Sequence, residues 1–351
     1  MEYSKETHIK GIGLSKPGAS TDFKVVYYER RPLGPRDLLV RVRAVSVNAA
    51  EPHVRKSGYL DPEPISEKNP LILGWDASGV VIAVGSDVKY YKVGDEVYYL
   101  GDATRKGTNL TEHTVDERIV GPKPKSLTHA QAAAIPLVFA TAWEGLVDQL
   151  HISKKPEKNR GKTILVVAGA GGVGSAVIQL AKRVFGLTVI ATASREDSAA
   201  YCKKMGADIV INHKNPLAEE LKKHDIKGVN YIYNCYNMTS EYFKQFGEII
   251  LAYGGIVGIM AFNEPLDLEP LFRKSISVST EFVFARIMRD ANPDRQREDL
   301  IKFARWIDEK KLEHNMTIVK DFSIENLAKA HEKLETGSMI GKYVLDNVDK
   351  F

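Results

Sequence analysis

The stretch VVAGAGGVGSA, residues 166–176, places four glycines in an otherwise apolar run. Gly169, Gly171 and Gly174 have the spacing GxGxxG and follow the apolar run TILVVA, residues 163–168. Glycines at this spacing allow a tight turn, close approach of the backbone to a pyrophosphate, and close packing of the next helix on the strand. The stretch therefore predicts a strand, a dinucleotide-binding turn and a helix. The alternative is a tight turn that binds nothing.

From Lys162 onward, apolar runs alternate with amphipathic segments. Strands are expected at residues 163–168, 188–193, 208–212, 229–235, 254–260 and 276–284. Helices are expected to begin near Gly172, Glu196, Pro216, Thr239 and Pro265. Because strand and helix alternate strictly, the connections should be right-handed crossovers in a parallel sheet. The fold class expected here is α/β with a doubly wound parallel sheet.

The chain on either side of this segment has a different pattern. In LLVRVRAVSVN, residues 38–48, Val40 and Val42 alternate with Arg41 and Arg43, which is typical of a half-buried strand. Further short strands are expected in the runs at residues 79–85 and 93–101, which contain Gly-Asp turn signals. The tail should form a helix, a strand, a helix and a strand at residues 295–312, 316–323, 325–336 and 341–348. We therefore expect a β-rich domain, barrel-like or sandwich-like, beside the α/β domain.

Composition excludes several classes of protein. A chain of 351 residues usually forms two domains, and its 49 Lys and Arg against 45 Asp and Glu leave a dispersed excess of +4 that argues against nucleic-acid binding. Cys202 and Cys235 are too few for a disulfide framework. No apolar run reaches about 18 residues, and the N-terminus has no export pattern. We expect a reduced, cytoplasmic protein that binds no membrane.

The end of the second expected strand indicates which dinucleotide binds. A site for NAD usually has Asp or Glu there, about 20 residues beyond the glycines, to bind the ribose 2′-hydroxyl. This chain has Ala193, Ser194 and Arg195 instead. Because Arg binds a phosphate through two hydrogen bonds, the 2′-phosphate of NADPH fits better. The alternative is that Arg195 is a surface residue of the next helix, paired with Glu196 or Asp197.

Motifs along the whole chain resemble the medium-chain dehydrogenase/reductase superfamily, and most closely its zinc-free quinone oxidoreductase branch. These motifs are VSVNAAEPHVRKSGY (45–59), LILGWDASGVVIAVGSDVKYYKVGDEV (71–97), AAAIPLVFATAWEGL (132–146), GAGGVG (169–174) and GKYVL (341–345). The resemblance implies a GroES-like domain at residues 1–133 and 286–351, with a Rossmann domain inserted at residues 134–285. It also implies a homodimer, joined through the strand expected at residues 276–284.

The resemblance allows zinc binding to be tested. Zinc-dependent relatives have a Cys where this chain has Asn48, and Gly-His-Glu where it has Gly74, Trp75 and Asp76. A four-cysteine zinc lobe is absent. His53 and His113 remain as candidate ligands, but a lone His near a strand is more often a hydrogen-bonded structural residue. We therefore expect no metal.

Without a metal ion, the reaction would depend on positioning and hydrogen bonds, which favours an acceptor that takes hydride readily. The expected function is NADPH-dependent reduction of a quinone or an α,β-unsaturated carbonyl. The alternatives are a zinc-independent ketone or aldehyde reductase, and an NADPH-binding protein with little turnover.

The resemblance also implies individual roles in catalysis. Asn48 would face the nicotinamide and substrate and donate to a developing oxyanion. Tyr59 or His53 would orient the substrate or pass a proton. The alternatives are that Asn48 is a turn residue that closes its strand and that Tyr59 is an exposed loop aromatic.

Further residues are implied in cofactor binding. Thr141 would meet the nicotinamide ribose, Gly172 and Val173 the pyrophosphate, and Ile259 and Met260 the nicotinamide. His213 would lie near the adenosine phosphate, or cap the following helix. Lys342 would reach the cofactor, or be solvated.

Overall fold

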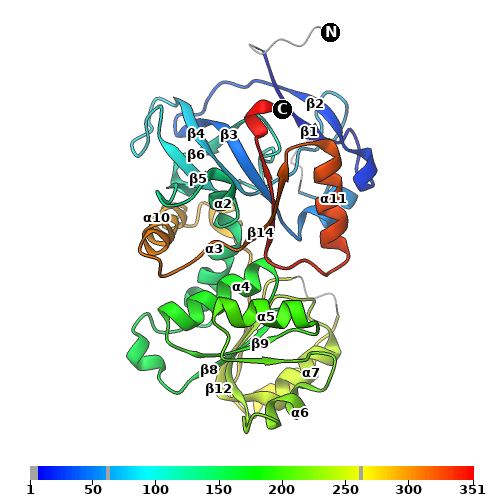
Figure 1. The fold of residues 1–351 in the computed structure, drawn as a ribbon, viewed down its shortest axis with the longest axis vertical. Helices are drawn as coiled ribbons and strands as arrows, with labels where there is room; N and C mark the ends of the chain where they lie inside the picture. The colour runs from blue at the N-terminus through cyan, green and yellow to red at the C-terminus, as the bar shows by residue number, and fades with distance from the viewer. Residues whose placement is uncertain (1–6, 61–63, 261–263) are drawn as a thin grey trace. The chain divides into compact units, whose positions relative to one another are not determined.

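The computed structural model describes residues 7–60, 64–260 and 264–351. The chain divides into two compact units (Figure 1). Unit 1 contains Met1–Leu137 and Phe284–Phe351, and unit 2 contains Val138–Val283. The domain boundaries expected after residues 133 and 285 lie four and two residues from these divisions.

Unit 2 is built on a six-stranded parallel sheet. Its strands are β8 (Thr163–Val167), β9 (Thr188–Thr192), β10 (Ile209–Ile211), β11 (Val229–Asn234), β12 (Ile250–Gly258) and β13 (Ser277–Thr280). Their order in space is β10-β9-β8-β11-β12-β13. The chain therefore winds outward from β8 to one edge, returns to the centre, and winds outward from β11 to the other edge. This is the doubly wound Rossmann order, and the expected fold class is confirmed.

Five α-helices connect these strands or follow them. They are α4 (Gly172–Gln179), α5 (Glu196–Met205), α6 (Leu217–Lys222), α7 (Ser240–Ile249) and α8 (Glu269–Phe272), all within the described part of unit 2. Four of them begin within one residue of the expected position, whereas α8 begins four residues later than expected. A π-helical segment, η5 (Leu180–Val184), continues α4, and a 3₁₀ turn, η4 (Pro156–Asn159), precedes β8.

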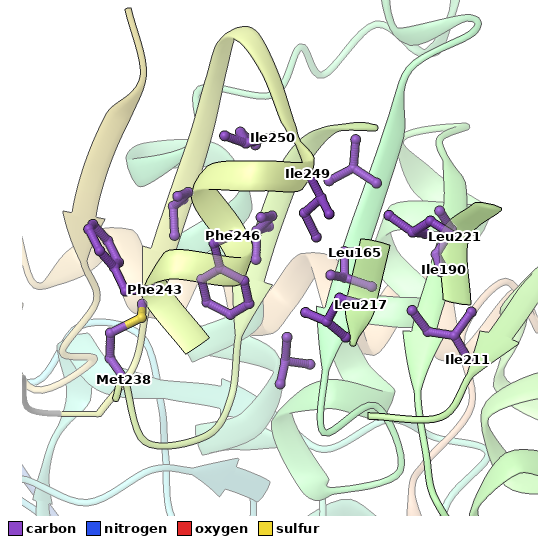
Figure 2. Packing of buried hydrophobic residues seen from close by; sticks show 14 of the residues in the cluster. Leu165, Ile190, Ile211, Leu217, Leu221, Met238, Phe243, Phe246, Ile249 and Ile250 are labelled. Atoms are coloured by element: carbon purple, nitrogen blue, oxygen red, sulfur yellow. The ribbon is translucent and has the colours of Figure 1, made fainter. Parts of the chain in front are cut away.

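The core on one face of this sheet explains the helix positions. Leu165 and Ile190 from the strands belong to one buried cluster with apolar residues of α6 and α7, including Leu217, Phe243 and Phe246 (Figure 2). In α7 the large buried side chains recur every three residues, at positions 243, 246 and 249, so a single face of the helix is apolar. Thr239 caps α7 by accepting a hydrogen bond from the Tyr242 backbone.

Unit 1 contains a seven-stranded, mainly antiparallel sheet and a separate hairpin. The sheet comprises β3 (Asp37–Val47), β4 (Ala77–Val84), β5 (Glu96–Tyr99), β6 (Glu112–Asp116), β7 (Val120–Pro122), β14 (Met316–Asp321) and β15 (Lys342–Asp346). The hairpin is β1 (His8–Gly13) with β2 (Lys24–Glu29). In β3, Val40 and Val42 are buried and Arg41 is exposed, as the alternation predicts. The β-rich character is therefore confirmed.

Strands from both ends of the chain join in this sheet. β15 pairs with β3 in antiparallel orientation, so Tyr343 lies opposite Val47. The described helices of unit 1 are α1 (Glu51–Ser57), α2 (His129–Ala133), α9 (Ala285–Met288), α10 (Asp294–Asp308) and α11 (Ile324–Glu335). Its 3₁₀ turns are η1 (Ser20–Asp22), η2 (Glu117–Ile119) and η6 (Val348–Lys350).

The helical run His129–Gln149 includes α2, α3 (Pro136–Glu144) and the π-helical η3 (Gly145–Gln149). By length and composition alone it could cross a membrane. However, 89% of its most apolar window is buried in the structure, as in the core helix of a soluble protein.

Candidate functional site

The glycine-rich turn of unit 2 has the geometry expected of a phosphate-binding turn. After β8, Ala168 adopts a positive φ of 56°, and its carbonyl accepts a hydrogen bond from the Gly171 backbone at 3.1 Å. Gly171 is then the N-cap of α4. The N-terminus of α4 therefore lies beside the turn, where the helix dipole favours an anion.

The three glycines of the motif have different roles. A Cβ on Gly169 would lie 2.8 Å from the Cβ of Ala191, and one on Gly174 would lie 2.4 Å from the Ala168 carbonyl oxygen. Both glycines are therefore required for close packing of turn, strand and helix. A Cβ on Gly171 would meet only the Ala168 oxygen, at 3.5 Å. The space beside Gly171 is therefore open enough for a pyrophosphate to approach the backbone.

This turn lies at the topological switch point of the sheet, between β8 and β11. In open α/β sheets, ligands bind at the carboxyl ends of the strands where the winding direction changes. The dinucleotide-binding interpretation therefore agrees with both the local turn and the strand order.

The end of β9 has no acidic side chain to bind a ribose 2′-hydroxyl. The Ala193 backbone donates to the Ile211 carbonyl at 3.0 Å, which brings the ends of β9 and β10 together. Ser194 is half-buried, and the Arg195 side chain is 43% exposed, with its Nε 3.3 Å from Asp197 Oδ1. The pairing with Asp197 agrees with the alternative that Arg195 is a surface residue of the next helix. The guanidinium nevertheless lies at the end of β9, where the phosphate interpretation needs it.

His213 follows β10 and lies within the electrostatic field of Arg195. Its pKa is lowered by burial, then by the charges of Lys214 and Arg195. Its Nδ1 is buried and has no hydrogen-bond partner. The capping alternative is wrong, because Pro216 is the N-cap of α6 and no side chain caps it. Lys214 and Arg195 thus place two positive charges beside the neutral imidazole of His213, at the ends of two neighbouring strands. These three residues are hereafter called the basic cluster.

The remaining cofactor residues of unit 2 are placed as follows. Ile259 and Met260 are half-buried and follow the carboxyl end of β12, and the Ile259 backbone donates to the Asn234 carbonyl at 3.3 Å. Thr141 is buried on α3, and its carbonyl accepts a hydrogen bond from the Tyr233 hydroxyl at 2.7 Å. Asn234 and Cys235, at the end of β11, were not predicted from the sequence, although every carboxyl end in a parallel sheet is a candidate.

Unit 1 contains a buried polar cluster that the sequence predicted only in part. Lys342, at the start of β15, is 2% exposed, and its ammonium lies 3.0 Å from Asp76 Oδ2. It also donates to the Val47 carbonyl at 3.1 Å and to the side-chain oxygen of Asn48. The Ser46 hydroxyl donates to Asp76 Oδ2 at 2.9 Å. These residues are called the Lys342 cluster below.

The position of Lys342 corrects one of its expected roles. It is not solvated, because it is buried. Its three N–H groups all have acceptors within unit 1, and contact with a cofactor stays a prediction.

Asn48 closes the turn between β3 and α1, as its alternative role predicts. Its backbone donates to Glu51 Oε1 at 2.9 Å, and its carbonyl accepts from the Glu51 backbone at 3.0 Å. Its amide Nδ2 donates to Asp76 Oδ2 at 2.9 Å and lies 3.4 Å from Glu51 Oε1. Donation to an oxyanion stays a prediction, and it would require the amide to move away from a carboxylate.

The other two candidate catalytic residues lie on or after α1. His53 is exposed on the helix, and Tyr59 is 64% exposed beyond its end. Within unit 1, neither is paired with Asn48. The exposure of Tyr59 agrees with the loop alternative.

Burial changes the charge states of Glu51, which is hydrogen-bonded to Asn48, and of His331, which lies beside Glu51. Glu51 is fully buried, and burial raises its pKa to about 8. Its Oε2 lies 3.8 Å from Nε2 of His331, and neither atom has a hydrogen-bond partner. Burial lowers the pKa of His331 to about 3, so this imidazole is neutral at physiological pH.

The described residues of unit 1 do not match the requirements of a zinc ion. Among the described residues, no three His, Cys, Asp or Glu side chains are grouped closely enough to hold a metal. His113 is buried between the Tyr99 hydroxyl at 3.2 Å and the Lys106 carbonyl at 3.0 Å, so both ring nitrogens have partners. The cluster around Asn48 contains an ammonium, which repels a cation. A catalytic zinc site needs three Cys, His or acidic ligands, and this donor set does not fit.

The two units together define a class of protein, namely a nucleotide-dependent oxidoreductase with a Rossmann unit and a β-rich unit. Comparison with known families agrees. The family described as "Alcohol dehydrogenase GroES-like domain" matches residues 34–144, and the one described as "Zinc-binding dehydrogenase" matches residues 172–303. The chain belongs to the medium-chain dehydrogenase/reductase superfamily, whose members bind a nicotinamide cofactor.

Individual relatives resemble nearly the whole chain. A zinc-type alcohol dehydrogenase-like protein of Staphylococcus aureus is 41% identical over 344 residues, which cover 96% of this chain and 100% of the relative. A chloroplastic NADPH-dependent alkenal/one oxidoreductase of Arabidopsis thaliana is 30% identical, covering 88% and 71%. The structure of a quinone oxidoreductase from Coxiella burnetii is 26% identical, with a TM-score of 0.79, covering 97% and 99%.

Proposed function

We propose that this oxidoreductase uses NADPH to reduce a quinone or an α,β-unsaturated carbonyl without a zinc ion. The basic cluster carries the proposal, because its charges favour the 2′-phosphate that distinguishes NADPH from NADH. The missing acid at Ala193 removes the usual acceptor for the ribose hydroxyl of NAD. The names of the Arabidopsis and Coxiella relatives support the cofactor and the acceptor classes, respectively.

The residues of unit 2 would bind and orient the cofactor. The first turn of α4 would hold the pyrophosphate beside Gly171, and the basic cluster would hold the adenosine phosphate. Ile259 and Met260 would lie against the nicotinamide, which supplies hydride when the cofactor is bound. In unit 1, Asn48 is the proposed donor to the oxyanion that forms as hydride arrives, and Tyr59 or His53 would orient the acceptor.

A panel of acceptors with NADPH and with NADH tests this proposal. We expect NADPH oxidation with quinones or activated enones to be faster than with simple ketones, because one amide donor contributes only about 3 kcal/mol to a developing oxyanion. Activity should survive treatment with a strong chelator. A preference for simple ketones would support a carbonyl reductase instead, and tight NADPH binding without turnover would support a binding protein. Stoichiometric zinc, with activity lost on its removal, would contradict the metal-free mechanism.

A further inference from the structure

The ammonium of Lys342 is enclosed by oxygen atoms of unit 1. An ammonium has three N–H donors. They are directed at the Val47 carbonyl, Asp76 Oδ2 and the side-chain oxygen of Asn48. The ammonium therefore needs no solvent and no further ligand.

The carboxylate of Asp76 likewise has hydrogen-bond donors at both of its oxygen atoms. Asp76 is fully buried, and its Oδ2 also accepts hydrogen bonds from Ser46 Oγ and Asn48 Nδ2, each at 2.9 Å. Its Oδ1 accepts from the Leu137 backbone at 2.8 Å. Removing one partner from a buried, hydrogen-bonded ion pair leaves an uncompensated charge, which strongly destabilises a protein.

The ammonium also determines how the amide of Asn48 is oriented. Its side-chain oxygen faces Lys342 and its nitrogen faces Asp76, so a rotated amide would place two donors together and two acceptors together. The same positive charge acts on Glu51, where it opposes the rise in pKa that burial causes. Lys342 thus acts on Asp76, on Glu51 and on the amide of Asn48.

We infer that Lys342 supplies the resident cation of this cluster in place of a metal ion, neutralising Asp76 and positioning Asn48. Its role in stability is independent of the proposed function. Its role in positioning rests on that function, because it matters only if Asn48 acts on the acceptor. Lys342 is therefore a positioning residue, not a group that touches the substrate.

Variants of the ion pair test the role in stability. K342M should lower Tm by roughly 10 °C, because Asp76 is left buried without a counter-charge. The control K329M removes an exposed lysine whose ammonium lies 2.5 Å from Glu325, and it should change Tm by only about 1 °C. The double variant D76N/K342M, which has no unpaired charge, should recover most of the loss. Equal Tm for K342M and K329M, or a double variant no more stable than K342M, would overturn the inference.

Chemical rescue and metal content give independent readouts. Methylammonium or ethylammonium should raise the Tm of K342A and leave that of the wild type unchanged. Wild-type protein and D76N are each incubated with zinc chloride and then desalted. Because the Lys342 cluster should bind no zinc, the two proteins should retain equal amounts of zinc. Failure of both alkylammonium ions to raise the Tm of K342A, or zinc retained by wild type and lost in D76N, would overturn the inference.

The catalytic arm uses the double variant, because its fold should be intact. D76N/K342M lacks the charges that orient Asn48, so kcat should fall by about a hundredfold while the Kd for NADPH stays within about twofold. An unchanged kcat would contradict the positioning role of Lys342 but not its role in stability. Absence of reductase activity in the wild type would instead contradict the proposed function, and the Tm measurements would still decide the role of the cation.

Discussion

At the scale of single residues, Arg195 is the position at which cofactor choice can be tested most directly. Its guanidinium lies at the end of β9, and its charge reaches His213 at the end of β10. A charge-assisted hydrogen bond to the 2′-phosphate contributes about 1.5–3 kcal/mol, so Arg195→Ala should weaken NADPH binding by roughly ten- to a hundredfold. NADH, which lacks that phosphate, should be nearly unaffected. The measurement is kcat/KM for both cofactors.

Two further variants make the result specific to this position. Ala193→Asp should narrow or reverse the preference for NADPH, because it adds an acceptor for the ribose and a charge that repels the phosphate. Lys203→Ala, which removes an exposed cation from the same helix, should leave kcat/KM unchanged for both cofactors. If Arg195→Ala weakens both cofactors equally, Arg195 is only a surface residue of α5.

Glu51 should make the stability of the protein depend on pH. Burial raises its pKa from 4.5 to about 8, so between these values the folded state holds a proton that the unfolded state has released. Stability should therefore fall as pH rises through this window. The lowered pKa values of His113 and His331 act only below about pH 6.5, where stability falls as pH drops. Burial also raises the pKa of Asp76, so the difference between wild type and Glu51→Gln from pH 6.5 to 8 isolates Glu51.

The measurement is the free energy of unfolding of wild type and Glu51→Gln across that interval. The wild type should lose about 2 kcal/mol more than the variant, because Gln keeps an acceptor for the Asn48 backbone and does not titrate. Parallel pH profiles for the two proteins would show that Glu51 does not hold a proton in the folded state.

At the scale of the element, different glycines of the turn between β8 and α4 serve packing and cofactor binding. Gly174→Ala places a Cβ 2.4 Å from the Ala168 oxygen and 2.8 Å from the Gly169 Cα, both of which are backbone atoms, so the helix must shift. We expect a lower Tm together with weaker NADPH binding. Gly171→Ala meets only one atom, at 3.5 Å, so it should leave Tm nearly unchanged and weaken NADPH alone. Thermal melts with and without NADPH distinguish the two variants. Equal loss of Tm in both would contradict the assigned roles.

At the scale of the whole molecule, the free edge of the six-stranded sheet predicts a homodimer. β13 lies at that edge and pairs with β12, and Phe282, just beyond it, is 48% exposed. An unpaired edge strand readily pairs with another chain. Sedimentation should give twice the mass of one chain, and Phe282→Asp should shift the protein toward the monomer. The control Val93→Asp, at an exposed apolar residue of unit 1, should not change the mass. A monomeric wild type would exclude the dimer.

Local patterns accounted for the order and type of the elements. The glycine motif, the strand before it and the helix after it were predictable because turn chemistry and hydrophobic period involve residues adjacent in the chain. The start of α8 and the short length of β13 were not, because packing against other elements determines where such elements begin and end. The positions of Ala193 and Arg195 at the end of the second strand were likewise predictable, because they lie a fixed number of residues beyond the glycines within one βαβ unit.

The sequence by itself therefore determined the fold class, the dinucleotide-binding turn and the residues at the end of β9. Only the tertiary structure brought Lys342 to Asn48, across 294 residues of chain, and His213 into the field of Arg195. The physical reason is that a buried charge is stable only beside partners that remove its desolvation cost, and the pairing of β15 with β3 places those partners together. A lysine considered alone is expected at the surface, so its burial followed from the assembled sheet.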